Sequence, residues 1–152
     1  MAGSFNGSFE HTIDSKGRLS IPARFREVLY GKGDNRVMIT NFFVEDLRFL
    51  DVYPVDEWLR MQEELKKKAK FDRRMIVFET FYIGNAAECA VDNQGRILIP
   101  ANLRRYANLK KNVVMTGVIE KFRIWDKDAH QRVVSEAEEK LDAEFLNGLL
   151  NS

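Results

Sequence analysis

The sequence contains few of the side chains on which disulfide-rich proteins and metalloproteins depend. It has one cysteine, Cys89, and two histidines, His11 and His130. A single cysteine excludes an internal disulfide framework and suits a reducing cytoplasm. These three side chains are also too few for a convincing His/Cys metal site. We therefore expect neither a metal nor any other cofactor.

The chain also lacks an excess of charge of either sign and any long apolar run. Its 24 Lys and Arg residues against 23 Asp and Glu residues give a formal net charge of +1. Overall charge therefore does not indicate a nucleic-acid partner, and such a role must depend on where the basic residues lie. No window approaches the roughly 18 apolar residues of a membrane span. The N-terminus has no basic stretch followed by an apolar one, so no secretory signal is expected.

The sequence does contain enough apolar side chains for a core, and it contains an internal repeat. Hydrophobic residues make up 45% of the 152 residues, which suits one domain or two very small ones. Residues 13–26 are IDSKGRLSIPARFR and residues 91–104 are VDNQGRILIPANLR, at a constant offset of 78. Seven of the 14 positions are identical: Asp14/Asp92, Gly17/Gly95, Arg18/Arg96, Ile21/Ile99, Pro22/Pro100, Ala23/Ala101 and Arg26/Arg104. Such a repeat predicts two copies of one supersecondary unit.

Each copy is expected to form a strand, a tight turn, a strand, a short helix, two further strands and a helix. Gly17 and Gly95 stand where a hairpin turn needs a positive φ, which glycine adopts without steric cost. Pro22 and Pro100 end the second strand and suit the first turn of a helix, where a missing N–H costs nothing. The predicted second strands are residues 19–21 and 97–99.

Two longer helices complete the expected fold. Residues 58–71 are predicted to form a helix between the halves that carries Lys66, Lys67, Lys68 and Lys70. Residues 129–150 are predicted to form one long amphipathic helix with an acidic outer face. Its apolar positions recur every four residues, at Val133, Ala137, Leu141, Phe145 and Leu149.

The duplicated Asp-x-x-Gly-Arg turns are the candidate functional site. Asp14 and Arg18 flank the first turn, and Asp92 and Arg96 flank the second. A carboxylate that accepts two guanidinium N–H bonds would fix the plane of the arginine, which bidentate recognition of guanine or phosphate requires. Such a pair can also be a plain surface ion pair, so a mainly structural role for Asp14 and Asp92 stays open. The other candidate DNA-contacting residues are Lys16, Arg24, Arg26, Gln94, Arg104 and Arg105.

The runs DSKGRLSIPARFR and DNQGRILIPANLRR resemble the AbrB-like DNA-binding half-domain. In that family two halves interleave into one swapped-hairpin barrel, usually from two chains. Two copies in one chain resemble specifically the MraZ family of bacterial transcriptional regulators. Residues 73–74 (RR), 84–89 (GNAAEC) and 121–126 (KFRIWD) support this narrower match. The resemblance covers roughly residues 5–130.

The resemblance implies an α+β, mainly β fold: a duplicated AbrB-like swapped-hairpin β-barrel, a pseudo-dimer in one chain, with flanking helices. We expect repeat 1 over residues 8–55, a basic helical linker over 56–85, repeat 2 over 86–129 and the C-terminal helix over 130–152. The family's DNA-contacting motif corresponds to Asp14 with Arg18 and to Asp92 with Arg96. Its paired arginines correspond to Arg104 and Arg105, whereas in the first copy Arg26 is followed by Glu27.

The implied function is that of a sequence-specific transcriptional regulator in the cytoplasm, at the nucleoid. It would bind short direct repeats of double-stranded DNA in the promoter of the cell-division and cell-wall gene cluster. It would do so as a homo-oligomeric ring, with no membrane or small-molecule partner.

Two other function classes compete with this interpretation. An enzyme could use Cys89 with a histidine, but Cys89 alternates with Ala87 and Val91 on a predicted strand, which is typical of a buried structural thiol. Residues 31–33 (GKG) lack the Walker spacing, and no carboxylates form a recognisable catalytic pair. We therefore predict that the chain is not an enzyme. An oligomeric protein-interaction scaffold could instead use the C-terminal helix and the pair Phe42-Phe43 without binding DNA.

Overall fold

The computed structural model describes residues 3–68 and 71–151, and both halves of the chain follow the predicted order of elements. The first half consists of β1 (Ser8–Thr12), β2 (Arg18–Ser20), α1 (Ala23–Gly31), β3 (Arg36–Val44), β4 (Leu47–Pro54) and α2 (Val55–Lys66). The second half consists of β5 (Ala87–Ala90), β6 (Arg96–Leu98), α4 (Ala101–Tyr106), β7 (Asn112–Gly117), β8 (Phe122–Asp126) and α5 (Lys127–Ser135). Between them lie α3 (Arg73–Phe78) and the π-helix η1 (Glu79–Ile83), and α6 (Ala137–Lys140) and α7 (Ala143–Leu150) follow α5.

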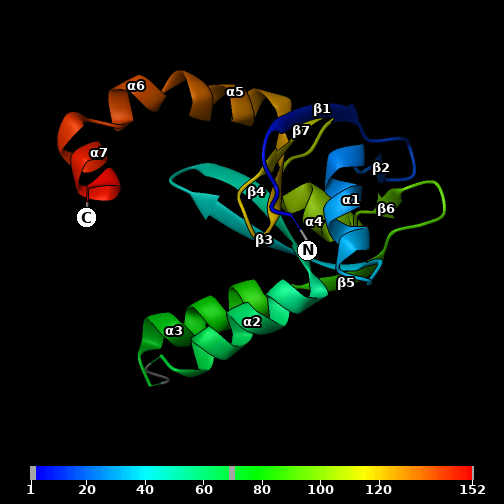
Figure 1. The fold of residues 1–152 in the computed structure, drawn as a ribbon, viewed down its shortest axis with the longest axis horizontal. Coiled ribbons are helices and arrows are strands. Elements are labelled where there is room, and N and C mark those ends of the chain that lie inside the picture. The colour runs from blue at the N-terminus through cyan, green and yellow to red at the C-terminus, as the bar shows by residue number, and fades with distance from the viewer. Residues whose placement is uncertain (1–2, 69–70, 152) are drawn as a thin grey trace.

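The strands form two antiparallel sheets to which both halves contribute (Figure 1). Six strands lie in one sheet in the order β1-β7-β8-β4-β3-β5, and β2 pairs with β6 in a separate two-stranded sheet. The first strand of each half pairs with a strand of the other half, β1 with β7 and β5 with β3. The halves therefore share one α+β fold and do not form two separate sheets.

The six-stranded sheet is open, so the prediction of a closed β-barrel was wrong. Among the described residues, its edge strands β1 and β5 do not pair with each other. The strands that follow them along the chain, β2 and β6, are only three residues long and begin one residue earlier than predicted. Pro22 and Pro100 come shortly after them and open α1 and α4. A proline offers no N–H to a strand ladder, which keeps these strands short. They pair with each other and are not part of the six-stranded sheet.

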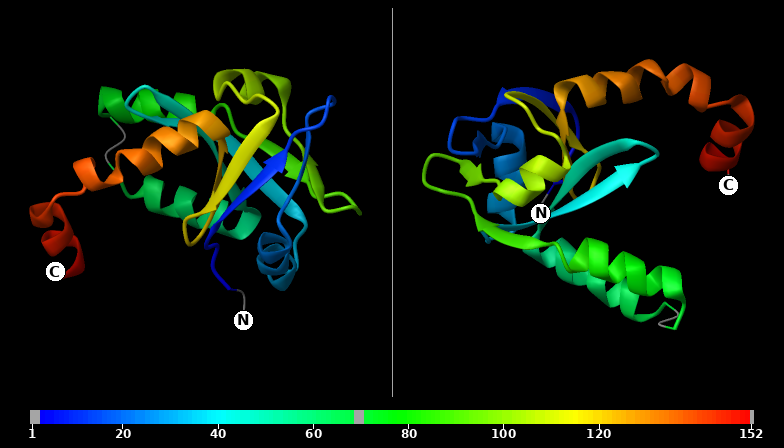
Figure 2. Two further views of the ribbon diagram at one scale, coloured as in Figure 1. Left: turned by 90° about the horizontal axis from the view of Figure 1, so that it is seen from above. Right: turned by 180° about the vertical axis from the view of Figure 1, so that it is seen from behind.

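The β2–β6 sheet lies on an approximate two-fold axis that relates the two halves. Leu19 pairs with Ile97 at its centre, and these residues are separated by the repeat offset. The flanking hydrogen bonds obey the same symmetry, because Ile21 N donates to the Gly95 carbonyl at 2.9 Å and Ile99 N donates to the Gly17 carbonyl at 3.0 Å. The axis places the two turns at the same end of the molecule, where the β1–β2 and β5–β6 loops project together (Figure 2).

The core is built jointly by both halves around a group of phenylalanines. Phe25 on α1 packs against Phe5, Phe9 and Phe122, with ring-centroid distances of 5.4, 5.2 and 4.9 Å. Phe5, Phe25 and Phe122 are each at most 1% exposed. Burial of one such side chain stabilises a fold by about 1.5–3 kcal/mol. Phe25 thereby fixes the position of α1, which carries Arg24 and Arg26.

The helix predicted over residues 58–71 begins earlier and ends earlier. The observed helix α2 covers Val55–Lys66, with Asp56 and Glu57 in its first turn, where acidic side chains interact favourably with the free N–H groups. Lys67 and Lys68 follow the helix, and Lys70 lies outside the described residues. Helix α3 and η1 then return alongside α2 (Figures 1 and 2).

A buried polar network fastens this helical linker to the large sheet. The hydroxyl of Tyr82, on η1, donates to Oδ2 of Asp51 and lies 2.7 Å from the hydroxyl of Tyr53. Asp51 also accepts a bond from Nε of Arg123 at 3.1 Å. Burial, reinforced by the Asp51 charge, raises the pKa of Tyr82, so its hydroxyl remains a donor. The linker helices are thus held by specific bonds as well as by apolar packing.

The prediction of a single helix over residues 129–150 was also wrong, because three helices occupy this region. Helix α5 ends at Ser135, α6 spans four residues, and α7 starts after Asp142. The side chain of Asp142 accepts the N–H of Phe145 at 2.8 Å and so caps a new helix start. Helices α5, α6 and α7 form a C-terminal arm that extends away from the sheets (Figure 1). On α7, Phe145 and Leu149 are 52% and 61% exposed.

Candidate nucleic-acid interface

Each duplicated turn is held by its own aspartate. In the first turn, Gly17 has a φ of +89° and its N–H donates to the Asp14 carbonyl at 3.0 Å. Oδ1 of Asp14 accepts the backbone N–H groups of Lys16 and Arg18, both at 2.9 Å. The second glycine, Gly95, has a φ of +76°. The prediction of a positive φ at both glycines is therefore confirmed.

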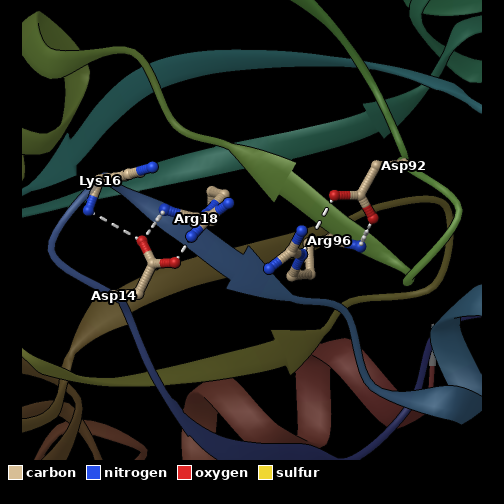
Figure 3. A network of polar contacts seen from close by, with 5 residues as sticks. All are labelled: Asp14, Lys16, Arg18, Asp92 and Arg96. Carbon is tan, nitrogen blue, oxygen red and sulfur yellow. Dashed lines mark hydrogen bonds and ion pairs between the residues drawn. The ribbon is translucent and has the colours of Figure 1, made fainter.

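The side chain of Arg18 is oriented by the other oxygen of the same carboxylate. Oδ2 of Asp14 accepts Nε of Arg18 at 2.7 Å (Figure 3). The expected second guanidinium bond is not formed, because the backbone N–H groups of the turn occupy Oδ1. Within the described chain, Nη1 and Nη2 of Arg18 have no hydrogen-bond partner. The aspartate therefore orients the guanidinium group and leaves its two Nη groups for a ligand.

The second turn repeats this geometry atom for atom. Oδ1 of Asp92 accepts the backbone N–H groups of Gln94 and Arg96, both at 2.9 Å, and Oδ2 accepts Nε of Arg96 at 3.1 Å. Because the same contacts recur 78 residues later, the short motif itself determines the arrangement.

The two arginines leave the same face of the β2–β6 sheet (Figure 3). Arg18 lies opposite Leu98 and Arg96 lies opposite Ser20. This register makes the arginines diagonal neighbours, a relation with a typical separation of about 7–8 Å. Their side chains are 35% and 27% exposed. Two guanidinium groups are thus presented together, each with its aspartate on the outer side.

Arg26 and Arg104 lie over the turns of the opposite halves. A Cβ atom added at Gly17 would overlap the guanidinium group of Arg104, and one added at Gly95 would overlap Arg26. Arg104 also donates from Nε to the Ile99 carbonyl at 3.0 Å. Both arginines are half-buried, so they support the turns as well as adding positive charge beside them.

The remaining predicted residues are exposed, and Arg105 lines a cavity with Asp46 and Arg132. Lys16 and Gln94 lie at the tips of the two turns, Arg24 near the start of α1, and Arg105 in the last turn of α4. Sequence reasoning missed Ser20 and Leu98, which lie on the same face as the arginines, with Leu98 56% exposed. Strand alternation offered the signal, since Leu98 stands between Ile97 and Ile99 and must point to the opposite face from them.

His11 and Cys89 occupy equivalent positions and do not form a catalytic pair with each other. His11 Nδ1 lies 2.7 Å from the Ser20 carbonyl, and Cys89 Sγ donates to the Leu98 carbonyl at 3.6 Å. Burial raises the pKa of the Cys89 thiol, which lowers its reactivity. In residues 3–68 and 71–151, no cluster of metal-binding side chains occurs, and no helix has the length and apolar character needed to cross a bilayer.

The carboxylate of Asp14 is expected to stay ionised well into acid. The N–H of Arg18, with its side chain and the Lys16 N–H, lowers the pKa of Asp14 from 3.8 to about 2. A lowered pKa stabilises the fold at pH values above 3.8, and this contribution is lost as the pH falls through about 2. A carboxyl ¹³C NMR titration should place the Asp14 midpoint near 2. A midpoint at 3.8 or above would mean that the turn contacts do not form in solution.

Comparison with known proteins places the chain in a family. The model of the family described as "MraZ protein, putative antitoxin-like" matches residues 4–78 and 82–151. The chain belongs to the MraZ family. Its MraZ relatives include a protein of Desulforamulus reducens that is 44% identical over 134 residues, which are 88% of this chain and 89% of that protein. The relative from Alkaliphilus metalliredigens is 44% identical over 124 residues, and the one from Syntrophobacter fumaroxidans is 37% identical over 147; these cover 82% and 95% of each chain.

All three MraZ relatives carry the name transcriptional regulator MraZ. The two segments that match the MraZ model each contain one copy of the duplicated turn. The family resemblance predicted from the motifs is therefore confirmed. MraZ proteins are named as transcriptional regulators and not as enzymes, which agrees with the prediction that this chain has no enzymatic activity.

Proposed function

We propose that this chain is a sequence-specific DNA-binding transcriptional regulator that contacts DNA with the outer face of the β2–β6 sheet. The observation that carries the proposal is the paired presentation of Arg18 and Arg96, each oriented through Nε by an aspartate. A guanidinium group held in this way suits the O6 and N7 acceptors of guanine in the major groove. A two-stranded β-sheet is also narrow enough to enter that groove.

The other residues of the proposed interface orient the two arginines or bind the phosphates of the DNA. Asp14 and Asp92 orient the arginines, and Gln94 lies at the second turn. The phosphate-binding side chains would be those of Lys16, Arg24, Arg26, Arg104 and Arg105. Contacts of this kind position a protein on the duplex without selecting sequence. Because the net charge of the chain is only +1, attraction to DNA depends on this local group.

We assign the exchange of strands between the halves to an AbrB-like swapped-hairpin arrangement within one chain. The pairings of β1 with β7 and of β5 with β3 support this assignment. The proposed units are repeat 1 over residues 8–55, the basic helical linker over 56–85, repeat 2 over 86–129 and a C-terminal helical arm over 130–152.

The proposed target is a set of short direct repeats in the promoter of the cell-division and cell-wall gene cluster, bound in the cytoplasm at the nucleoid. One chain has few base contacts, so several copies in a homo-oligomeric ring would gain affinity by engaging successive repeats. The exposed apolar side chains of α7, including Phe145 and Leu149, support self-association.

The same apolar arm supports the second candidate, an oligomeric scaffold that does not bind DNA. A fluorescence anisotropy titration on duplex DNA separates the two functions. A DNA-binding chain should lose affinity as salt rises, with log K falling by about 0.9 per log unit of salt for each neutralised phosphate. A scaffold should give no saturable signal and no slope.

A further inference from the structure

The backbone around the two turns is symmetric, but the side chains are not. The β2–β6 register, the aspartate contacts and the position of an arginine over each glycine repeat at both turns. The tips differ, because the first turn carries Ser15 and Lys16 where the second carries Asn93 and Gln94. All four tip side chains are exposed, and none has a hydrogen bond to the described protein. The tips are therefore free to contact different features of a ligand.

The charge beside the two turns differs in the same direction. Ile13 N donates to the Lys111 carbonyl next to the first turn, and Val91 N donates to the Asn35 carbonyl next to the second, which makes Lys111 and Asn35 structural equivalents. Lys16, Arg104 and Lys111 lie at the first turn. Their equivalents at the second turn are Gln94, Arg26 and Asn35. Three basic residues therefore stand at the first turn and one at the second.

These two chemistries recognise different parts of a duplex. Ammonium and guanidinium groups attract phosphate in any sequence. Exposed amides carry both a donor and an acceptor, and Asn or Gln forms a bidentate contact with N6 and N7 of adenine in the major groove. Since neither amide at the second tip has a partner within the described protein, both can turn toward a base edge.

From this asymmetry we propose that the protein binds DNA with a fixed polarity, with the first turn as the phosphate anchor and the second turn as the adenine-reading end through Asn93 and Gln94. The inference rests on the proposed function of the β2–β6 face. It goes further because it assigns the base specificity at one end of the site. An approximate two-fold protein surface then requires an asymmetric half-site, since only one of the two tips reads a base.

The test exchanges the tip residues and measures affinity and base discrimination separately. The probe is a duplex that the wild-type chain selects from a randomised pool, together with a panel in which each base pair is replaced in turn. Gln94→Ala should reduce discrimination at one A·T pair at the edge of the site by about 5- to 150-fold. It should leave the slope of log K against log salt unchanged. Lys16→Gln should weaken binding to every panel member equally and reduce the size of the slope by about 0.9.

Gln94→Lys and Asn93→Ala provide the matched controls. Gln94→Lys should add about 0.9 to the size of the salt slope and still lose the adenine preference. Asn93→Ala should weaken the same A·T preference or that of its neighbour. If Gln94→Ala and Lys16→Gln both change affinity uniformly across the panel, the assignment of base reading to the second turn is wrong although DNA binding stands. If the wild-type chain enriches no sequence from the pool, the proposed function fails, and the assignment with it.

Discussion

The double variant Arg18→Ala/Arg96→Ala is expected to bind its selected duplex at least about 30-fold more weakly than the wild-type chain. Each bidentate arginine–guanine contact provides about 1–3 kcal/mol of discrimination, and 1.4 kcal/mol corresponds to a factor of about ten. In the structure each guanidinium group is already oriented by Nε, so its Nη groups can bind a base with little further ordering. Fluorescence anisotropy against the selected duplex and a scrambled duplex measures the loss.

The single variants test whether the two halves contribute equally. Arg18 and Arg96 have the same aspartate contacts and similar exposure, so their orientation does not distinguish them. Because the first turn is the proposed phosphate anchor, Arg18→Ala should lose more nonspecific affinity than Arg96→Ala. The ratio of specific to nonspecific affinity should fall in both.

Arg74→Ala is the control for loss of one positive charge. Its side chain is 92% exposed on α3 in the linker, which extends away from the turns (Figure 1). This variant should bind with nearly wild-type affinity. Circular dichroism and size-exclusion chromatography should show an unchanged fold and assembly for all these variants, because Arg18 and Arg96 lie on the surface. If the double variant binds DNA with wild-type affinity, Arg18 and Arg96 are not part of the DNA interface.

The duplicated motif made the turns predictable because their geometry depends on residues only a few positions apart. The offset of 78, the glycines and the prolines were sufficient for the element order and for the positive φ at Gly17 and Gly95. The Asp–Arg pairing was predicted as well, but its detail was not. Pattern reasoning did not include the backbone N–H groups of the turn, which take Oδ1 of Asp14 and leave one guanidinium bond.

The pairing of strands far apart in the chain was less predictable, because the sequence of one strand does not specify which other strand it pairs with. Nothing in residues 8–12 alone specifies pairing with β7, and the open sheet depends on that choice. The prediction for the C-terminal arm was wrong for a different reason. Its apolar spacing of four residues continues across the breaks, so periodicity predicts one helix. The competing signal was Asp142, a favoured residue for capping a helix start.

Phe25→Ala is expected to cause the largest loss of stability among single substitutions near the interface. Phe25 is 1% exposed and touches three other phenylalanine rings from the N-terminal segment, β1 and β8. Truncation of such a side chain removes its buried area and leaves a cavity, at a cost of about 3–5 kcal/mol. For a chain of this size that corresponds to a fall in Tm of roughly 6–20 °C, measurable by differential scanning calorimetry.

Phe71→Ala provides the matched control because Phe71 is fully exposed. Its free energy of unfolding should stay within about 0.5 kcal/mol of wild type. Phe25→Ala should also reduce DNA affinity at temperatures where the chain is still folded, because α1 places Arg26 over the second turn. Phe71→Ala should not. If Phe25→Ala unfolds like the wild type, α1 does not pack between the N-terminal segment and the sheet, and the support of the second turn must come from elsewhere.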